Sequence, residues 1–336
     1  MKKAILGILL IPFCLSCQKI LFREEIASEN PRTNFEYLWK ECNNKYAFMK
    51  YKGIDWQVVY NKYSPKVNDG ISKDSLFNVM ASMLNELRDG HVNIISPFNI
   101  SIYPVHLLGP KNIDKRLIEE HYLSKPYFIT GPFVHSFIDS NRIGYIQFSA
   151  FTGTVDSEQM DYMLEKYRNT RGLILDLRSN GGGAATDIYK IMNRFVESKT
   201  KIFKTKDKSG PGADEFSEGL DSYLEPASGI RYKNKVVILT DRGTYSAGSY
   251  TSLASKALDN VILVGDTTGG GLGMPNGGQL PNGWTYRFSV TQTLDLNGNN
   301  WENGVPPDVL AILDLADVAN GKDSVIEKAI EELKKP

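Results

Sequence analysis

Residues 171–183 read RGLILDLRSNGGG, an apolar run that ends in a polar turn and three consecutive glycines. A short apolar run bounded by turn residues is typical of a strand buried on both faces. Two similar runs, KVVIL at 235–239 and VILV at 261–264, alternate with segments of helical pattern. Strands that alternate with helices predict right-handed βαβ units and a largely parallel sheet covered by helices. The fold class is therefore expected to be α/β.

The N-terminal part of the chain has a different pattern, with aromatic residues that suggest two helices within residues 34–63. In residues 76–87 the apolar side chains recur on one helical face, with Ser72 as the expected N-cap and Gly90 as the expected stop. His91 should then lie on the loop beyond this helix. We predict an N-terminal helical subdomain over residues 31–92.

The pattern of the remaining sequence predicts a core over residues 93–320 and a C-terminal helix over residues 321–336. Within the core, residues 199–234 lack periodicity and are expected to form an insertion loop. The run WTYRFSVTQTLDLNG, residues 284–298, is expected to form a hairpin.

The charge balance bears on the partners of the protein. The 336 residues include 39 basic and 39 acidic side chains. A phosphate backbone is bound through a basic surface, so this balance argues against a nucleic-acid partner. The sequence has neither an H-E-x-x-H motif nor paired cysteines, and no metal or other cofactor is expected.

The N-terminus, MKKAILGILLIPFCLSC, has two lysines followed by an apolar stretch too short to span a bilayer, which is typical of an export signal. Ser16 before Cys17 resembles the lipobox of bacterial lipoproteins. We expect a signal peptide at 1–17, lipidation at Cys17 and a polar tether at 18–30. The protein would then be anchored in the bacterial cell envelope by its lipid only. An ordinary secretory signal is the alternative.

Ser246, in the stretch RGTYSAGSY at 242–250, stands between an apolar strand and a helix. It could cap the helix or act as a nucleophile, because a helix N-terminus stabilises negative charge. The glycine turn lacks both nucleotide-binding patterns, G-x-x-x-x-G-K-[ST] and G-x-G-x-x-G, and Thr244 replaces the first glycine of a G-x-S-x-G elbow. Asp176 ends its strand as an active-site acid or as a partner of Arg178.

Four segments, LRDGHV, LILDLRSNGGG, TYSAGSY and ENGVPPDV, occur in the order and at the spacing of the tail-specific, or C-terminal processing, serine peptidases. The resemblance covers roughly residues 33–318. It implies a core of the crotonase/ClpP-like type, with Ser246 as the nucleophile. It also implies an oxyanion hole formed by the backbone N–H groups of Ala247 and Gly182.

The chain departs from the family at two points. Gly271 stands where bacterial members carry a lysine as general base, so the resemblance points to the tricorn-like branch, which uses a histidine, here His91. Glu302 is then the carboxylate expected to orient the site, with Asp176 as a possible supporting acid. Only about 50 residues separate His91 from the strand at Ile143, too few for the peptide-binding PDZ domain of many members.

The resemblance implies a serine endopeptidase with a Ser–His pair that acts on peptides or proteins through an acyl-enzyme. The alternative is an inactive relative that binds a peptide or an apolar molecule in the same cleft, as the interphotoreceptor retinoid-binding proteins do. In that case we expect an apolar, closed cleft with His91 out of reach of Ser246.

Overall fold

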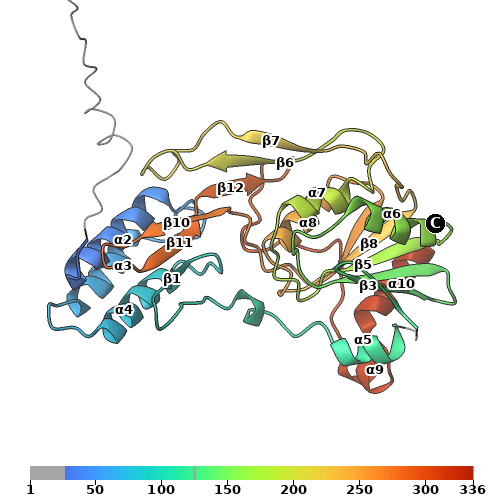
Figure 1. The fold of residues 1–336 in the computed structure, drawn as a ribbon, viewed down its shortest axis with the longest axis horizontal. Helices are drawn as coiled ribbons and strands as arrows, with labels where there is room; N and C mark the ends of the chain where they lie inside the picture. Colours follow the sequence, from blue (N-terminus) through green and yellow to red (C-terminus); the bar gives the residue numbers. More distant parts are fainter. Residues whose placement is uncertain (1–26, 124–125, 336) are drawn as a thin grey trace, which may run out of the picture.

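The computed structural model describes residues 27–123 and 126–335, which form two lobes joined by a long ribbon of strands (Figure 1). The predicted signal peptide, the lipidation site Cys17 and most of the tether lie outside the described residues. No helix within the described ranges is both long and apolar enough to cross a membrane.

The larger lobe is built on a seven-stranded sheet in the order β13-β9-β8-β5-β4-β3-β2. Strands β4, β5, β8, β9 and β13 are parallel, and β2 and β3 extend the sheet as an antiparallel edge. In chain order the strands are β2 (Phe128–Thr130), β3 (Phe133–Ile138), β4 (Ile143–Phe148), β5 (Gly172–Asp176), β8 (Lys235–Thr240), β9 (Val261–Gly265) and β13 (Val309–Leu310).

Both faces of this sheet are buried, which explains the continuous apolar runs of its central strands. Leu173 and Leu175 of β5 pack into one core, whereas Ile174 between them packs into the core on the opposite face. Helices α6 (Ser157–Lys166), α7 (Thr186–Met192) and α8 (Ala247–Ser255) cover the first face; α5 (Lys115–His121) and α10 (Ser324–Lys334) cover the second. The short α9 (Leu315–Ala319) precedes α10. The predicted α/β class is confirmed.

The smaller lobe contains the helices α2 (Pro31–Lys45), α3 (Trp56–Tyr63) and α4 (Lys73–Asn85), with a short 3-10 turn, η1 (Ser64–Lys66). Ser72 caps α4 as expected, since its side chain accepts a hydrogen bond from Ser75 N. The helix ends at Asn85, before Gly90. A small sheet of β1 (Asn93–Ile95), β11 (Thr285–Ser289) and β10 (Pro275–Gln279) packs on these helices and shares their core. A late part of the chain therefore completes the N-terminal lobe.

The ribbon that joins the lobes corrects two predictions. Residues 199–234 are not a loop: they contain β6 (Thr200–Asp207) and β7 (Leu220–Leu224), which pair with each other and with β12 (Thr291–Leu294). The expected hairpin at 284–298 is also wrong, because β11 pairs within the small lobe and β12 pairs with β6. No glycine, proline or asparagine interrupts residues 285–294, so the chain passes straight from one sheet into the other.

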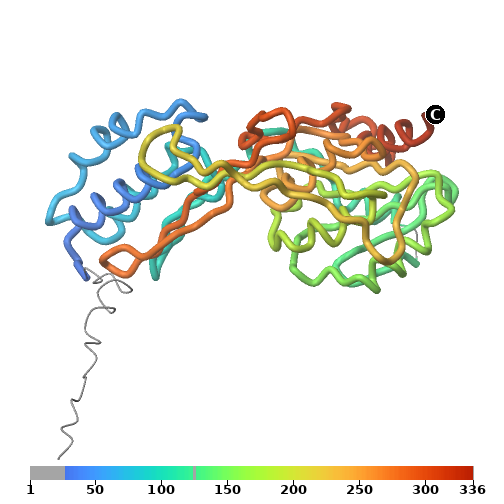
Figure 2. Tube along the Cα trace, turned by 90° about the horizontal axis from the view of Figure 1, so that it is seen from above, coloured from blue at the N-terminus to red at the C-terminus, as the bar shows by residue number. Residues whose placement is uncertain are grey.

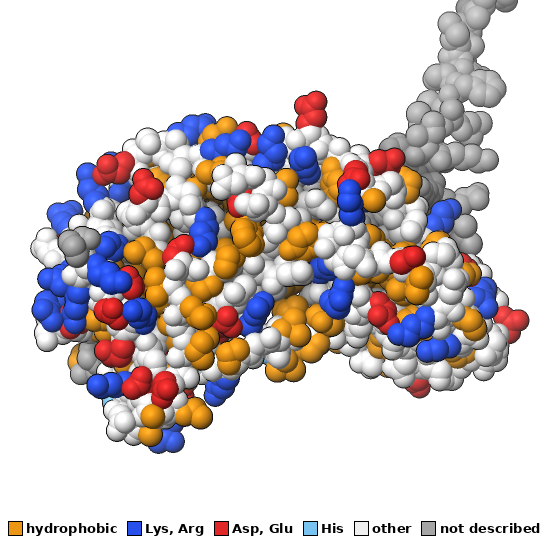
Figure 3. Space-filling model, turned by 180° about the vertical axis from the view of Figure 1, so that it is seen from behind, with side chains coloured by type: hydrophobic (Ala, Val, Ile, Leu, Met, Phe, Trp, Pro, Cys, Tyr) orange, Lys and Arg blue, Asp and Glu red, His pale blue; other side chains and the backbone are white. Residues whose placement is uncertain are grey.

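Residues 96–114 lead the chain from the small lobe to the large one. This segment has little secondary structure and includes η2 (Val105–Leu107). The described part of residues 93–142 contains no PDZ domain. Exposed hydrophobic side chains mark this segment: Phe98, Ile100, Ile102, Leu107 and Leu108. Seen from above, the two lobes meet at a narrow waist (Figure 2), and hydrophobic surface gathers there in the space-filling view (Figure 3).

Candidate active site

Ser246 lies in the turn between β8 and α8, and it has a strained backbone with φ of 53° and ψ of −120°. A helix-capping serine has an extended backbone and accepts a hydrogen bond from the first turn of the helix. The Ser246 side chain makes no such bond, so the capping interpretation is wrong. Bonds from Ser246 N to Gly270 O, 3.0 Å, and from Tyr245 N to Asn180 O, 2.9 Å, hold the turn in place. Strain that is held in this way is typical of functional sites.

The Ser246 hydroxyl faces His91 across the junction of the lobes, with 3.0 Å between His91 Nε2 and Ser246 Oγ. His91 follows α4 on the loop that enters β1, and its ring packs against that of Tyr245 with 4.8 Å between centroids. Two residues 155 positions apart in the chain thus meet within hydrogen-bond distance. This is the arrangement of a hydroxyl beside a base.

The His91 ring is buried, with an exposed fraction of 6%. Burial lowers the pKa of the imidazole, and the charges of Arg287 and Lys52 lower it further, against the opposing charge of Asp89. The ring is therefore neutral near pH 7 and able to accept a proton. Its Nδ1 is buried without a hydrogen-bond partner of normal geometry, although the Gly273 backbone is close enough to favour the protonated ring.

The glycine turn lies directly against the serine. A Cβ atom on Gly182 would stand 2.7 Å from Ser246 Cβ and 2.8 Å from Ala247 N, and the φ of Gly182 is 90°. Its N–H, however, donates to Asn180 Oδ1 at 2.9 Å, because the Asn180 side chain folds back over the turn. The structure thus places Gly182 beside Ser246, but its N–H, the predicted oxyanion donor, is engaged with Asn180. No residue of the described ranges accepts a hydrogen bond from Ala247 N–H.

A Gly182→Ala variant is expected to lose stability and to disturb the Ser246 turn, since the added methyl group has no space and the backbone has a positive φ. We expect the midpoint of thermal unfolding to fall by several degrees, for a destabilisation of about 2 kcal/mol. Gly181→Ala is the matched control, because a Cβ there meets nothing within 4 Å. Equal melting temperatures for the two variants would contradict this account of the turn.

Glu302 lies in a turn between β12 and β13 and is buried, and its carboxylate makes no hydrogen bond to His91. Its Oε2 accepts a hydrogen bond from Leu272 N at 2.7 Å, and its Oε1 is 3.8 Å from Lys52 Nζ. Burial, and then the charge of Asp89, raise the pKa of the Glu302 carboxyl well above its ordinary value, against the effect of Lys52. Glu302 thus holds the loop that contains Gly271.

Gly271 explains why a lysine at this position does not fit. Its φ is 75°, and a Cβ atom there would stand 2.4 Å from the Tyr245 ring. A lysine of the small lobe lies near this position instead. The side chain of Lys52, which follows α2, is buried and donates a hydrogen bond to Arg88 O at 2.9 Å. Lys52 was not predicted as a site residue, because a lysine between two helices carries no sequence signal of burial.

Asp176 is not part of this site. Its carboxylate accepts hydrogen bonds from Arg178, at 2.6 Å to Nη2, and from Tyr145 Oη at 2.7 Å. The same arginine also binds Asp323. The predicted supporting acid therefore belongs to a separate buried ion cluster behind the glycine turn, and this prediction is wrong.

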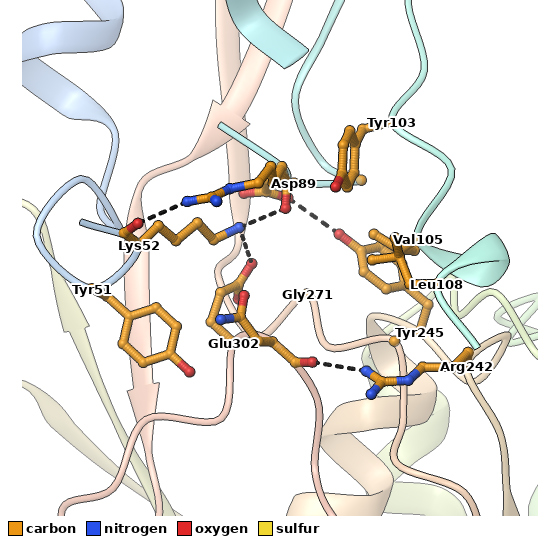
Figure 4. A pocket seen from close by; sticks show the side chains of 14 residues that line it. Tyr51, Lys52, Asp89, Tyr103, Val105, Leu108, Arg242, Tyr245, Gly271 and Glu302 are labelled. Carbon is orange, nitrogen blue, oxygen red and sulfur yellow. Dashed lines mark hydrogen bonds and ion pairs between the residues drawn. The ribbon is translucent and has the colours of Figure 1, made fainter. Parts of the chain in front are cut away.

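A pocket of about 410 Å³ (Figure 4) is lined by Gly90 and Tyr245, the chain neighbours of His91 and Ser246, although neither His91 nor Ser246 itself lines it. Its walls come from both lobes, and Tyr103, Val105 and Leu108 of the connecting segment form one of them. Lys52, Asp89 and Glu302 meet at its inner end, as Figure 4 shows, with Arg242 on the far side. The pocket thus combines apolar and charged walls.

Comparison with known proteins shows to which family this fold belongs. Residues 142–311 match the model of peptidase family S41, and residues 27–85 match the tricorn protease C1 domain. A crystal structure of a putative peptidase from Parabacteroides merdae ATCC 43184 is similar, with a TM-score of 0.88 and 35% identity over 92% of this chain and 98% of that one. The mature CPAF structure shares the fold, with a TM-score of 0.67 and 12% identity over 91% of this chain and 96% of that one.

The carboxy-terminal processing protease CtpA of Bacillus subtilis (strain 168) is 29% identical over 184 residues, which are 54% of this chain and 37% of CtpA. The chain thus matches only about a third of the length of that relative. Fold and matches together define the class of protein, a chain of mixed α/β structure with the fold of a peptidase. The chain belongs to peptidase family S41.

Proposed function

We propose that the protein is a serine endopeptidase in which Ser246 is the nucleophile and His91 is the general base. The 3.0 Å contact between His91 Nε2 and Ser246 Oγ is the observation that carries this proposal. The depressed pKa of His91 supports it, because a base must be unprotonated at the working pH.

The reaction follows from these positions. Ser246 Oγ attacks the carbonyl carbon of the scissile peptide while its proton passes to His91 Nε2. The N–H of Ala247 stabilises the oxyanion, and such a donor contributes about 3 kcal/mol of barrier reduction. His91 then gives the proton to the leaving amine as the C–N bond breaks. A water molecule, activated by His91, hydrolyses the ester and restores Ser246.

Glu302 is proposed to act on this site indirectly. Its carboxylate binds Leu272 N, and the Gly273 backbone lies near the His91 ring. Glu302 therefore holds the loop against which the ring rests. Gly271 leaves no lysine on this loop, which supports a Ser–His rather than a Ser–Lys pair.

A fluorophosphonate probe tests the proposal, because an activated serine hydroxyl attacks its phosphorus and is phosphonylated with loss of fluoride. Mass spectrometry is expected to find the label at Ser246 of the wild type and to find none in Ser246→Ala. Folded wild-type protein without any label would instead favour the ligand-binding alternative. That alternative is weakened by the charged lining of the pocket and by the position of His91.

The rate of labelling is expected to depend on pH through His91. The folded pKa of this ring lies below the ordinary value of 6.5, so the neutral base is lost only as the pH falls through that lower value. The rate should therefore reach its plateau at a pH below the ordinary value of 6.5 and fall only at lower pH. Stopped labelling at pH 5 to 9 measures this profile. A rate that keeps rising well above pH 8 would indicate a lysine as the base, and Lys52 would be the first residue to replace.

We also propose that the protein is a lipoprotein of the cell envelope, anchored through Cys17, a residue outside the described ranges. Wild-type protein made in a bacterial host is expected in the detergent phase of a Triton X-114 partition, and Cys17→Ala in the aqueous phase. Cys14→Ala is the matched control and should behave as the wild type. Wild-type protein in the aqueous phase would contradict the anchor.

A further inference from the structure

One buried carboxylate, that of Asp89, links the loop of the histidine to the turn of the serine. Asp89 lies between α4 and β1 and has an exposed fraction of 2%. Both of its oxygens are engaged: Oδ1 accepts hydrogen bonds from His91 N at 2.8 Å and Tyr245 Oη at 3.2 Å, and Oδ2 accepts from Tyr46 Oη at 3.0 Å and Ser289 Oγ at 2.9 Å.

The Oδ1 side of Asp89 faces the reacting groups. His91 follows Asp89 by two residues, and Tyr245 directly precedes Ser246 in the chain. The Tyr245 ring packs against the His91 ring while its hydroxyl reaches Asp89. Burial, and then the charge of Asp89, raise the pKa of the Tyr245 hydroxyl, so it remains a proton donor. The loop of the histidine and the turn of the serine thus donate hydrogen bonds to the same atom, Asp89 Oδ1.

The Oδ2 side of Asp89 faces the small lobe. Tyr46 is the C-cap residue of α2, and Ser289 is the last residue of β11. Both donors are fixed in the core of that lobe, where Tyr46 is 1% exposed. Movement of the carboxylate would break hydrogen bonds on one side or the other, and a buried acceptor that loses its donors is destabilising.

The carboxylate remains charged despite its burial. Burial opposes ionisation, but the charges of Lys52 and His91, the His91 N–H and the Ser289 hydroxyl together lower the pKa of Asp89 below its ordinary value. Lys52, Asp89 and Tyr245 point toward one another in Figure 4. A charged acceptor forms stronger hydrogen bonds than a neutral one, which favours a single arrangement of the donors.

We propose that Asp89 is a positioning residue that fixes His91 and the Ser246 turn in their reactive arrangement, with Tyr245 as the strut between them. This inference rests on the proposed roles of Ser246 and His91. Neither Asp89 nor Tyr245 takes part in proton transfer: Asp89 holds the histidine by its backbone, and Tyr245 holds the serine through the adjoining peptide.

Asp89→Asn and Tyr245→Phe test the proposal with almost no change of shape. Asparagine retains an acceptor but loses the charge, and phenylalanine removes only the hydroxyl of the strut. Each variant is expected to slow fluorophosphonate labelling of Ser246 by about 10- to 100-fold, as small misplacements of reacting groups do. Tyr232→Phe is the matched control, because this buried tyrosine hydroxyl binds Thr170 O, far from the site.

Titration of the histidine rings by NMR gives the second readout. The chain has four histidines, and the His91 signal is the one that disappears in His91→Ala. Asp89→Asn should lower the His91 pKa further, because the Asp89 charge favours the protonated ring. Tyr245→Phe should shift the NMR signal of the His91 ring, because the tyrosine ring that packs on it loses its hydrogen bond to Asp89. Tyr232→Phe should leave the His91 signal unchanged.

Folded Asp89→Asn protein with the wild-type labelling rate and an unchanged His91 titration would overturn the inference. If Asp89→Asn does not fold, Tyr245→Phe decides, and a wild-type rate in that variant overturns it. If the wild type itself is not labelled, the proposed function fails, and the His91 titration then decides the positioning role alone. A ring unaffected by both variants would refute it; a ring changed by both supports it.

Discussion

His91→Ala is expected to lower the second-order rate constant for fluorophosphonate labelling of Ser246 by about 10³- to 10⁶-fold. The reason is that the hydroxyl of a serine is weakly nucleophilic without a base, and His91 Nε2 stands 3.0 Å from Ser246 Oγ. The fold should survive the change, because Nδ1 makes no hydrogen bond that would be lost. Time courses of labelling, read by intact-protein mass spectrometry, give the rate constants.

His121→Ala is the matched control for this variant, since His121 ends α5 on the surface of the large lobe, away from the pocket. It should be labelled at the wild-type rate. Added imidazole should restore part of the labelling of His91→Ala, because the missing ring leaves a space beside Ser246. A rate for His91→Ala within tenfold of the wild type would remove His91 from the mechanism and would direct attention to Lys52.

The parts of the fold that were predicted correctly are those with a local signal. β5 and β8 are buried on both faces, so their sequences are continuous apolar runs, and helices of clear periodicity follow them. The ribbon was missed for the opposite reason. β6 reads TKIFKTKD, and most of its residues are only partly buried, so neither alternation nor a long apolar run marks it as a strand. One of its two partner strands, β12, follows more than eighty residues later in the chain, as in the pair Asp207 and Thr291.

In the candidate site, too, residues with a local sequence signal were predicted and contacts without one were not. Ser246 and His91 were found from short motifs, whereas their contact depends on how the two lobes pack. No sequence pattern predicts that the Lys52 side chain is buried or that Gly182 N donates a hydrogen bond to Asn180 Oδ1. Asp176 was misassigned because a carboxylate at the end of a strand is common to active sites and to structural ion pairs. Only the position of Arg178, and of Asp323 far along the chain, distinguishes the two.

That ion cluster is where we expect the largest effect on stability. Arg178 is fully buried and donates to Asp176, to both oxygens of Asp323 at 3.0 Å, and to Asn112 O at 3.0 Å. Asp323 in turn caps α10 by accepting from Val325 N and Ile326 N. The guanidinium thus joins the glycine turn to the C-terminal helix.

Arg178→Met would fill most of the volume but leave two buried carboxylates without a cation. We expect the free energy of unfolding at pH 7 to fall by about 3–5 kcal/mol, as in other buried pairs that lose one partner. Urea denaturation measures it. Arg168→Met is the control: its pair with Glu165 is exposed, and the loss should stay below about 1 kcal/mol.

The pH dependence of this loss tests its cause. Burial already holds the pKa of the Asp323 carboxyl above its ordinary value, against the charge of Arg178, and loss of that charge should raise it further. A carboxyl with a raised folded pKa destabilises the fold at high pH, and this cost disappears as the pH falls below the unfolded value of about 3.9. The difference between Arg178→Met and the wild type should therefore shrink between pH 7 and pH 4. A difference that stays constant would mean that the loss comes from packing rather than from the two unpaired charges.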